Sequence, residues 1–249
     1  MSKKNISICI VAGAGGLIGS RIAEDFSNTY DKVYSLDKKI SDSSKTENIK
    51  NIEVDLTDEA SVSKVFGSIF SSNSGSEQHT AISKLALINC QAISDPHSGP
   101  LAELKLDKWN EYLNINLTSY FLNCREALRH REKYKSLRIV NISSTRHLIA
   151  EPDTEAYGTT KGGVLSFTRS LAVSLRDTDS LVNCISPGWI DEENKEHSSE
   201  NKSQHLSGRV GKPSDISNLC LHLCSHVGDF ISGQDFVVDG GITAKMVYK

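Results

Sequence analysis

The chain has 249 residues, of which 38% are hydrophobic and 24% charged, and its formal net charge is −3. These values are ordinary for a globular protein, so we predict a single domain over residues 1–249. The nearly balanced charge gives no basic field for nucleic acid or a membrane surface, and no run approaches the roughly 20 apolar residues of a membrane helix. We therefore predict a cytoplasmic protein that binds neither nucleic acid nor a membrane.

Short apolar runs alternate along the chain with longer segments of helical periodicity. The apolar runs predict strands at residues 6–13, 32–37, 51–56, 85–92, 137–144, 181–188 and 235–241. The periodic segments predict helices at residues 17–30, 57–70, 107–135, 155–176 and 214–225, with Thr57 as the N-cap of the second. Such alternation is typical of an α/β fold, in which helices cover both faces of a parallel sheet. The longest polar stretch, residues 191–210, is either a substrate lid or a solvated loop.

The segment VAGAGGLIGS, residues 11–20, joins the first predicted strand to the first predicted helix. Glycine allows a sharp turn and a close approach to a pyrophosphate, and the helix N-terminus adds free N–H groups and a positive dipole end. This context predicts a dinucleotide-binding turn. Its residues are Gly13, Gly15, Gly16, Leu17, Ile18 and Gly19.

Asp37 ends the second predicted strand, 18 residues after Gly19. A carboxylate at this place accepts hydrogen bonds from an adenosine ribose and repels a 2′-phosphate, which favours NAD over NADP. Lys38 and Lys39 follow directly and would attract a phosphate, so NADP stays open. The alternative interpretation of Asp37 is an ordinary turn residue.

Six cysteines are present, and none belongs to a Cys-x-x-Cys pair or to a histidine spacing typical of zinc sites. Most fall within apolar strand or helix patterns. We therefore expect reduced, buried thiols and no metal site. The six are Cys9, Cys90, Cys124, Cys184, Cys220 and Cys224.

Tyr157 and Lys161 are four residues apart, which places them one turn apart on the same face of the predicted helix. A nearby ammonium favours the phenolate of a tyrosine over its neutral form, as a general base requires. Ser144 ends the fifth predicted strand, and the carboxyl ends of such strands face the ligand crevice. Asn116 lies within a predicted helix, where it is either functional or an ordinary surface or capping residue.

In combination, these residues resemble the short-chain dehydrogenase/reductase family, in its single-domain branch. The resemblance spans nearly the whole chain, and Ser144 precedes Tyr157 by 13 residues, the family's usual spacing. Further matching segments are Asp55-Leu56, LNINLTSYF around Asn116, Pro187-Gly188 and the ending SGQDFVVDGG.

The resemblance implies a doubly wound Rossmann fold with about seven parallel strands and an oxidoreductase that interconverts a secondary alcohol and a carbonyl. Tyr157 would transfer the proton, and Lys161 would stabilise its phenolate and hold the nicotinamide ribose. Ser144 would polarise the substrate oxygen, and Asn116 would anchor a water of the proton relay. A homo-oligomer, either a tetramer or a dimer, is also implied. The cofactor residues that the resemblance assigns are Gly13, Gly15, Gly16, Leu17, Ile18, Gly19, Asp37, Asp55, Leu56, Asn89, Cys90, Gln91, Tyr157, Lys161, Pro187, Gly188 and Ile190.

The sequence departs from the family pattern in three places. Ala12 and Leu17 replace the usual threonine and middle glycine of the glycine turn. Asn89-Cys90-Gln91-Ala92 stands where the family has Asn-Asn-Ala-Gly, and Glu192 where a threonine usually contacts the nicotinamide amide. These departures keep a second class of function open, a nicotinamide-binding sensor or scaffold of low activity.

Arg146 and His147 follow Ser144 by two and three residues and are expected to line the substrate pocket with Ser144 and Tyr157. A guanidinium there would hold a carboxylate or phosphate, or it would pair with Glu151 or Asp153 on the surface. We therefore expect a small polar substrate, either anionic or sugar-like. The alternative substrate is a 3-oxoacyl thioester, reduced with NADPH.

Overall fold

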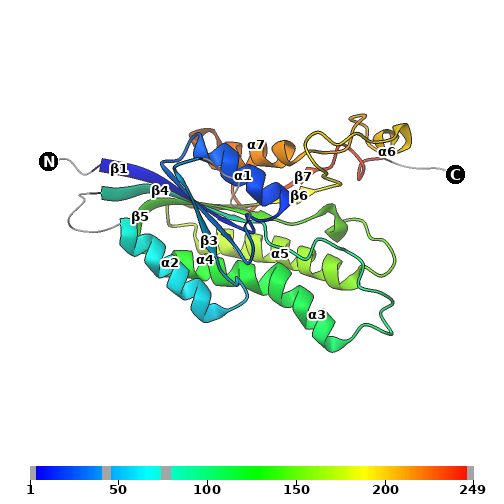
Figure 1. The fold of residues 1–249 in the computed structure, drawn as a ribbon, viewed down its shortest axis with the longest axis horizontal. Helices are drawn as coiled ribbons and strands as arrows, with labels where there is room; N and C mark the ends of the chain where they lie inside the picture. Colours follow the sequence, from blue (N-terminus) through cyan, green and yellow to red (C-terminus); the bar gives the residue numbers. More distant parts are fainter. Residues whose placement is uncertain (1–3, 41–45, 74–79, 246–249) are drawn as a thin grey trace.

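The computed structural model describes residues 4–40, 46–73 and 80–245, and within them the strands form one seven-stranded parallel sheet (Figure 1). Its order is β3-β2-β1-β4-β5-β6-β7. The strand bounds are β1 Lys4–Ala12, β2 Lys32–Asp37, β3 Ile49–Glu53, β4 Thr80–Asn89, β5 Tyr134–Ile142, β6 Ser180–Pro187 and β7 Asp235–Val238. The order reverses beside β1, so the chain winds outward in both directions and the predicted doubly wound α/β fold is confirmed.

Helices cover both faces of this sheet (Figure 1). The pair α1 and α7 lies on one face, and α2, α4 and α5 lie on the other. The helix bounds are α1 Leu17–Ser27, α2 Glu59–Asn73, α3 Leu106–Leu113, α4 Ser119–Arg129, α5 Glu155–Ser174, α6 Ser199–Ser203 and α7 Pro213–Leu223. None of the helices in the described ranges is both long enough and apolar enough to cross a membrane.

The central strands are buried on both faces, which explains their nearly continuous apolar runs. In β1, Ile8 and Ile10 pack under α2 and α4, whereas Cys9 and Val11 pack under α1 and α7. All four are inaccessible to solvent. Burying each of the isoleucine side chains contributes about 1.5–3 kcal/mol, so the two hydrophobic cores hold the sheet rigid between its helix layers.

The single helix predicted at residues 107–135 is wrong in its middle and at its end. A π-helical segment, Asn114–Thr118, separates α3 from α4, and β5 already begins at Tyr134. The Asn116 side chain in this segment bonds to groups outside the helix, which local periodicity does not reveal. Tyr134 pairs with Ile82 of β4, and this sheet contact overrides the helical pattern.

The predicted N-cap Thr57 is also wrong, because Asp58 caps α2. The Asp58 carboxylate accepts the Ser61 N–H at 2.8 Å, and the helix begins at Glu59. The Thr57 hydroxyl donates instead to Asp55 Oδ1 at 2.6 Å. Threonine and aspartate are both good N-cap residues. Only the contact between Thr57 and Asp55 shows why Asp58 is the cap.

Residues 191–210 fold over the ends of β6 and β7, around α6 (Figure 1). His205 is 4% exposed, and the N–H of Ser207 donates to the carbonyl of Gly240 at 3.0 Å. The Arg209 guanidinium pairs with Asp215 at the start of α7. The segment is thus attached to neighbouring elements rather than being a fully solvated loop, and its role as a lid stays a prediction.

Candidate active site

The glycine turn lies at the carboxyl end of β1, and the surrounding backbone leaves no room for a side chain at several of its positions. Gly13 has φ +88°, and a Cβ there would overlap the backbone of Gln91. A Cβ on Gly19 would overlap the carbonyl of Gly13. Gly16 precedes α1 and provides no side-chain cap. The N–H groups in the first turn of α1 are therefore available to a ligand at the positive end of the helix dipole. A turn of this shape fits the pyrophosphate of a dinucleotide.

The carboxylate of Asp37 lies directly against the glycine turn. Its Oδ2 accepts the N–H of Gly15 at 3.0 Å, and its Oδ1 accepts the N–H of Lys38 at 2.7 Å. A cavity of about 150 Å³, the glycine-turn cavity, opens beside it. The predicted cofactor residues that line this cavity are Gly13, Gly16, Asp37, Asp55, Leu56, Cys90 and Gln91.

Asp55 extends the charged wall of the glycine-turn cavity. Lys38 Nζ lies 3.0 Å from its Oδ2. Although burial opposes the charged form, hydrogen bonds from Thr57 and Lys38 hold the pKa of Asp55 below its ordinary value. Asp37 and Asp55 thus present two carboxylates, of which only Asp55 has a lysine as counterion within the described residues.

The residues that follow β4 divide between the cavity and the core. Gln91 lines the glycine-turn cavity and donates from Nε2 to Ser119 Oγ at 2.7 Å. Burial raises the pKa of the Cys90 thiol to about 12, so this thiol is neutral at physiological pH. Asn89, the last residue of β4, lies elsewhere, because its side chain bonds to Asn141 of β5 and Asn123 of α4 in the protein interior. The side chain of Asn89 is therefore outside the cavity that was expected to receive the cofactor.

Ser144 and Tyr157 line one shared cavity of about 550 Å³, the tyrosine cavity. Lys161 lies behind Tyr157, with Nζ 5.6 Å from the centroid of the tyrosine ring. Its ammonium donates to the carbonyl of Ile142 at 3.0 Å, at the end of β5. The fold thus brings together a hydroxyl, a phenol and an ammonium from β5 and α5.

Asn116 joins this group through the π-helical segment. Its Oδ1 accepts the N–H of Ile93 at 2.7 Å, and its Nδ2 donates to Thr160 Oγ1 at 3.3 Å. Thr160 lies on α5 between Tyr157 and Lys161. Asn116 therefore attaches the segment after β4 to the helix that carries the tyrosine. Its predicted contact with a relay water stays a prediction. π-Helical insertions occur often at functional sites.

Arg146 and His147, the two residues predicted to determine substrate specificity, differ in their position relative to the tyrosine cavity. Arg146 lines the tyrosine cavity, and its Nη1 lies 2.8 Å from Glu151 Oε2, so the ion pair considered as an alternative is present. His147 was expected in the same cavity but faces away from it, and its side chain is 6% exposed. Its imidazole contacts Ser186 and Asp235 instead, which explains this departure.

The segment after β6 closes the tyrosine cavity. Gly188 and Ile190 line it as predicted cofactor residues, whereas Pro187 is the last residue of β6 and Glu192 lies outside the lining. Several lining residues belong to none of the sequence motifs, and among them Trp189 could have been found from its position directly after Pro187-Gly188. The other missed lining residues include Ser94, Pro96, Ile149, Ala150, Gln204 and Ile242.

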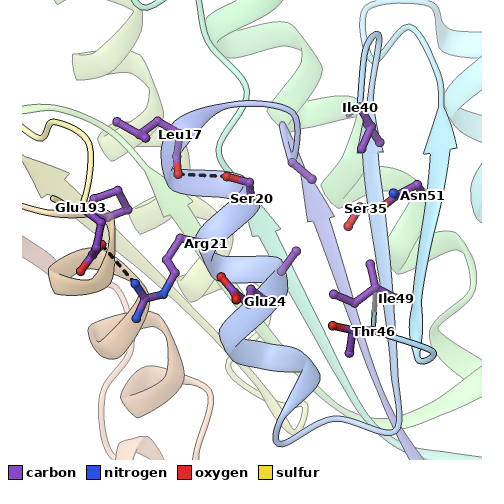
Figure 2. Close-up of a pocket in the computed structure, with 13 residues that line it drawn as sticks. Leu17, Ser20, Arg21, Glu24, Ser35, Ile40, Thr46, Ile49, Asn51 and Glu193 are labelled. Carbon is purple, nitrogen blue, oxygen red and sulfur yellow. Dashed lines mark hydrogen bonds and ion pairs between the residues drawn. The ribbon is translucent and has the colours of Figure 1, made fainter. Parts of the chain in front are cut away.

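A larger cavity, of about 630 Å³, lies elsewhere, between α1 and the β2–β3 edge (Figure 2). Leu17, predicted to contact the cofactor, is on its rim, and Ile18 packs into the core beneath α1. Arg21 pairs there with Glu193 at 3.1 Å. No residue of the predicted tetrad lines this cavity.

Comparison with known proteins gives matches over nearly the whole chain. The family model described as enoyl-(acyl carrier protein) reductase matches residues 13–243. An uncharacterized oxidoreductase of Thermotoga maritima is 32% identical over 97% of this chain and 98% of its own length. The 3-oxoacyl-[acyl-carrier-protein] reductase FabG of Aquifex aeolicus is 30% identical over 95% of this chain and 87% of its own length.

Solved structures show the same architecture. The aldohexose dehydrogenase of Thermoplasma acidophilum superposes with a TM-score of 0.85 and 26% identity, covering 98% of this chain and 97% of that one. A 4-hydroxyisoleucine dehydrogenase complexed with NADH gives a TM-score of 0.81 and 28% identity, covering 96% and 100%. The match over nearly the full length and the assembled motif residues confirm the resemblance seen in the sequence: the chain belongs to the short-chain dehydrogenase/reductase family.

Proposed function

We propose that the protein is a nicotinamide-dependent oxidoreductase that interconverts a secondary alcohol and a carbonyl on a small polar substrate. The observation that carries this proposal is the shared cavity of Ser144 and Tyr157, with the Lys161 ammonium 5.6 Å from the tyrosine ring. A scaffold or sensor has no need of this arrangement. The proposal therefore places catalysis ahead of a purely binding function.

The glycine turn and Asp37 would hold the pyrophosphate and the adenosine ribose of the cofactor. Asp37 already accepts the Gly15 N–H with Oδ2, and its negative charge opposes a 2′-phosphate. The neighbouring Lys38 pairs with Asp55, which reduces its attraction for a phosphate. These contacts favour NAD over NADP. The bound nicotinamide would supply or accept the hydride.

The residues of the tyrosine cavity would move the proton. Tyr157 would donate its phenolic proton to the substrate oxygen during reduction and accept it during oxidation. Lys161 would stabilise the phenolate from behind the ring. Ser144 would hold the same substrate oxygen through its hydroxyl. Asn116 would keep α5 in place against the segment after β4.

The lining of the tyrosine cavity supports a polar substrate with a compensated charge. Its charged lining residues within the described part of the chain are Arg146 and Glu151, which pair with each other. This pair favours a hydroxylated or zwitterionic molecule over a bare anion. Two structural neighbours carry names that mention an aldohexose and 4-hydroxyisoleucine, both of which are polar and hydroxylated.

A second candidate is the reduction of a 3-oxoacyl thioester with NADPH. The apolar side chains of Ile149, Trp189 and Ile242 in the lining favour it. The names of the matching family model and of the Aquifex aeolicus relative also point to acyl-carrier substrates. An acetoacetyl thioester represents this class of substrate in the substrate screen.

A substrate screen with purified protein tests these proposals. Polar secondary alcohols, the corresponding carbonyls and the thioester are each offered with NAD(H) and NADP(H), and absorbance of the reduced cofactor is followed. We expect turnover of a polar alcohol with NAD, and a loss of about 10²–10⁴-fold in Tyr157→Phe. Tyr30→Phe is the matched control, because the Tyr30 hydroxyl contacts the Cys224 carbonyl on the other sheet face. Cofactor binding without any turnover would leave the sensor function.

We further propose that the protein is a homo-oligomer. Large apolar side chains are exposed at Val173, Val227 and Phe230, and the last of these is fully accessible in the single chain. Burying such groups between copies would remove them from water. Light scattering during size-exclusion chromatography tests this, and a mass of one chain would contradict it.

A further inference from the structure

The imidazole of His147 lies behind the tyrosine cavity, between β6 and β7. Its Nε2 is 3.1 Å from Ser186 Oγ and 3.0 Å from Asp235 Oδ2. The His147 and Asp235 side chains are 6% and 10% exposed, and Ser186 is inaccessible. Three polar groups from distant parts of the chain thus meet in a nearly dry site, where each must find a partner.

The hydrogen bonds among these groups assign their protons. Ser186 Oγ lies 2.6 Å from Asp235 Oδ1, so its single proton is donated to the carboxylate. Its oxygen can then only accept, and Nε2 of His147 must carry a proton and donate. The arrangement is therefore no nucleophilic triad, because the histidine takes no proton from the serine and the serine is sealed from solvent. It is a clamp on the main chain that carries His147.

That main chain is the serine turn, Ser143–His147, which holds Ser144. On its first side, Ser143 donates from its N–H to the Ile185 carbonyl at 2.7 Å and from Oγ to the Lys161 carbonyl at 2.8 Å. Within the turn, Ser144 Oγ accepts the N–H of Arg146 at 3.2 Å. On its second side, the His147 side chain holds the turn through its contacts with Ser186 and Asp235. Ser144 therefore lies between two anchors.

Helix α5 closes the third side of the serine turn. A Cβ on Gly158 would lie 3.2 Å from the carbonyl oxygen of Arg146, tighter than an ordinary contact. A Cβ on Gly162 would lie 3.9 Å from the Cβ of His147, which is an ordinary contact distance. The helix that carries Tyr157 and Lys161 thus approaches the turn along its glycine edge. A shift of the turn would move Ser144 relative to Tyr157.

We propose that His147, held by Ser186 and Asp235, is a positioning residue that fixes Ser144 opposite Tyr157 in the tyrosine cavity. The proposal rests on the proposed function, in which Ser144 holds the reacting oxygen. His147 touches neither the cavity nor any reacting atom, so it acts only through the serine turn. Misplacement of a reacting group by about 1 Å can cost roughly 10²-fold in rate, which is the scale expected for loss of the clamp.

Three variants separate the clamp from simple packing. His147→Leu removes the donor and keeps an apolar side chain, whereas His147→Gln keeps an N–H donor at similar reach. Asp235→Asn weakens the acceptor. His226→Leu is the control, because that imidazole is 95% exposed and its ion-pair partner is Asp229 rather than a residue of the serine turn. We expect kcat to fall by about 10²-fold in His147→Leu and to recover by at least about tenfold in His147→Gln. The dissociation constant for NADH, measured by fluorescence, should stay within about twofold.

A second readout needs no substrate. Hydrogen exchange of the amides of Arg146 and Leu148 reports the serine turn, and that of Ile139 reports the core of β5. We expect faster exchange at the turn alone in His147→Leu. Unchanged kcat with unchanged exchange would overturn the proposal. Loss of protection at Ile139 together with a lower melting temperature would reduce His147 to a packing residue and overturn it too. If the wild type shows no turnover, the proposed function fails, and the exchange data still decide whether the clamp orders the turn.

Discussion

The ammonium of Lys161 lies 5.6 Å from the centroid of the Tyr157 ring, and the lysine residue as a whole is 2% exposed. No carboxylate in the described residues lies within ion-pair distance of it, and its fixed partner is the carbonyl of Ile142. A buried cation without a counterion is costly. A phenolate on Tyr157 would supply the missing negative charge, which links the stability of the cation to the chemistry.

Removal of that cation should therefore impair proton transfer. In Lys161→Met, we expect kcat to fall by about 10²–10⁴-fold, because the phenolate loses its stabilising charge. Lys133→Met is the control, since the ammonium of this lysine lies 3.8 Å from Glu132 directly before β5, outside both cavities. Steady-state kinetics with the substrate from the screen measure both. Wild-type turnover in Lys161→Met would contradict the assigned role.

The contact between Asp37 and Gly15 predicts the basis of cofactor choice. Asp37→Ala removes the charge that opposes a 2′-phosphate, so the ratio of NAD to NADP affinity should fall by at least about tenfold. Asp31→Ala, a change outside the glycine-turn cavity, serves as control. Fluorescence titration with NADH and NADPH gives both dissociation constants. An unchanged ratio would show that Asp37 only shapes the turn.

Asn116 should contribute to stability as well as to catalysis. In Asn116→Leu, the N–H of Ile93 loses its acceptor, and such a loss costs about 1–3 kcal/mol. Asn114→Leu changes the same residue type at an exposed position of the same π-helical segment. Urea unfolding should show a lower midpoint for the first variant only. Equal midpoints would mean that the contact is replaced by water.

The Arg209–Asp215 pair predicts a pH-dependent contribution to stability. Hydrogen bonds from Arg209, at 2.6 and 2.7 Å, lower the pKa of Asp215 in the folded chain. Between the folded pKa and the ordinary value of about 3.9, the unfolded chain binds more protons, so stability rises with pH in this window. The contribution is complete above the ordinary value and is lost as the pH falls through the folded pKa.

Urea unfolding of Asp215→Asn tests this sign. The difference in unfolding free energy from the wild type should be constant between pH 5 and 7, by the linkage relation, and should shrink below about pH 4. Asp177→Asn is the control, because that carboxylate is 85% exposed. A difference that grows towards low pH would contradict the assignment.

The cysteine thiols should resist alkylation in the native protein. Burial raises the pKa of Cys90 and Cys124 to about 12, so neither forms the reactive thiolate at pH 8. Native protein should react slowly with iodoacetamide, whereas all six thiols should react in urea. Mass spectrometry of the labelled chain counts them. Rapid labelling of Cys90 that NADH prevents would instead show an accessible glycine-turn cavity.

Local sequence signals predicted most of the fold and part of the site. The strands were recognisable because burial on both faces demands continuous apolar runs, and the glycine turn because only glycine fits beside Gln91. Arg146 and Glu151 are close in sequence, so their pairing could be named in advance as one of two possibilities. Each of these features depends on neighbours within a few residues or on a general property of the fold.

The features that sequence reasoning missed depend on distant partners. His147 faces Ser186 and Asp235, which lie 39 and 88 residues away, and no local pattern connects them. The break in the helix at residues 107–135 arises because Asn116 reaches Ile93 and Thr160. Thr57 failed as a cap because its hydroxyl already had a partner in Asp55.

The π-helical segment Asn114–Thr118 also determines how this part of the chain tolerates the deletion of a residue. A π turn accommodates one residue more than an α turn. Deleting that extra residue would leave an unbroken α-helix with a normal circular dichroism spectrum, but Asn116 would lose the position from which it reaches Ile93 and Thr160. The damage would be to the placement of one side chain rather than to secondary structure, so even a deletion that suits the helix should loosen the contact between the segment after β4 and α5.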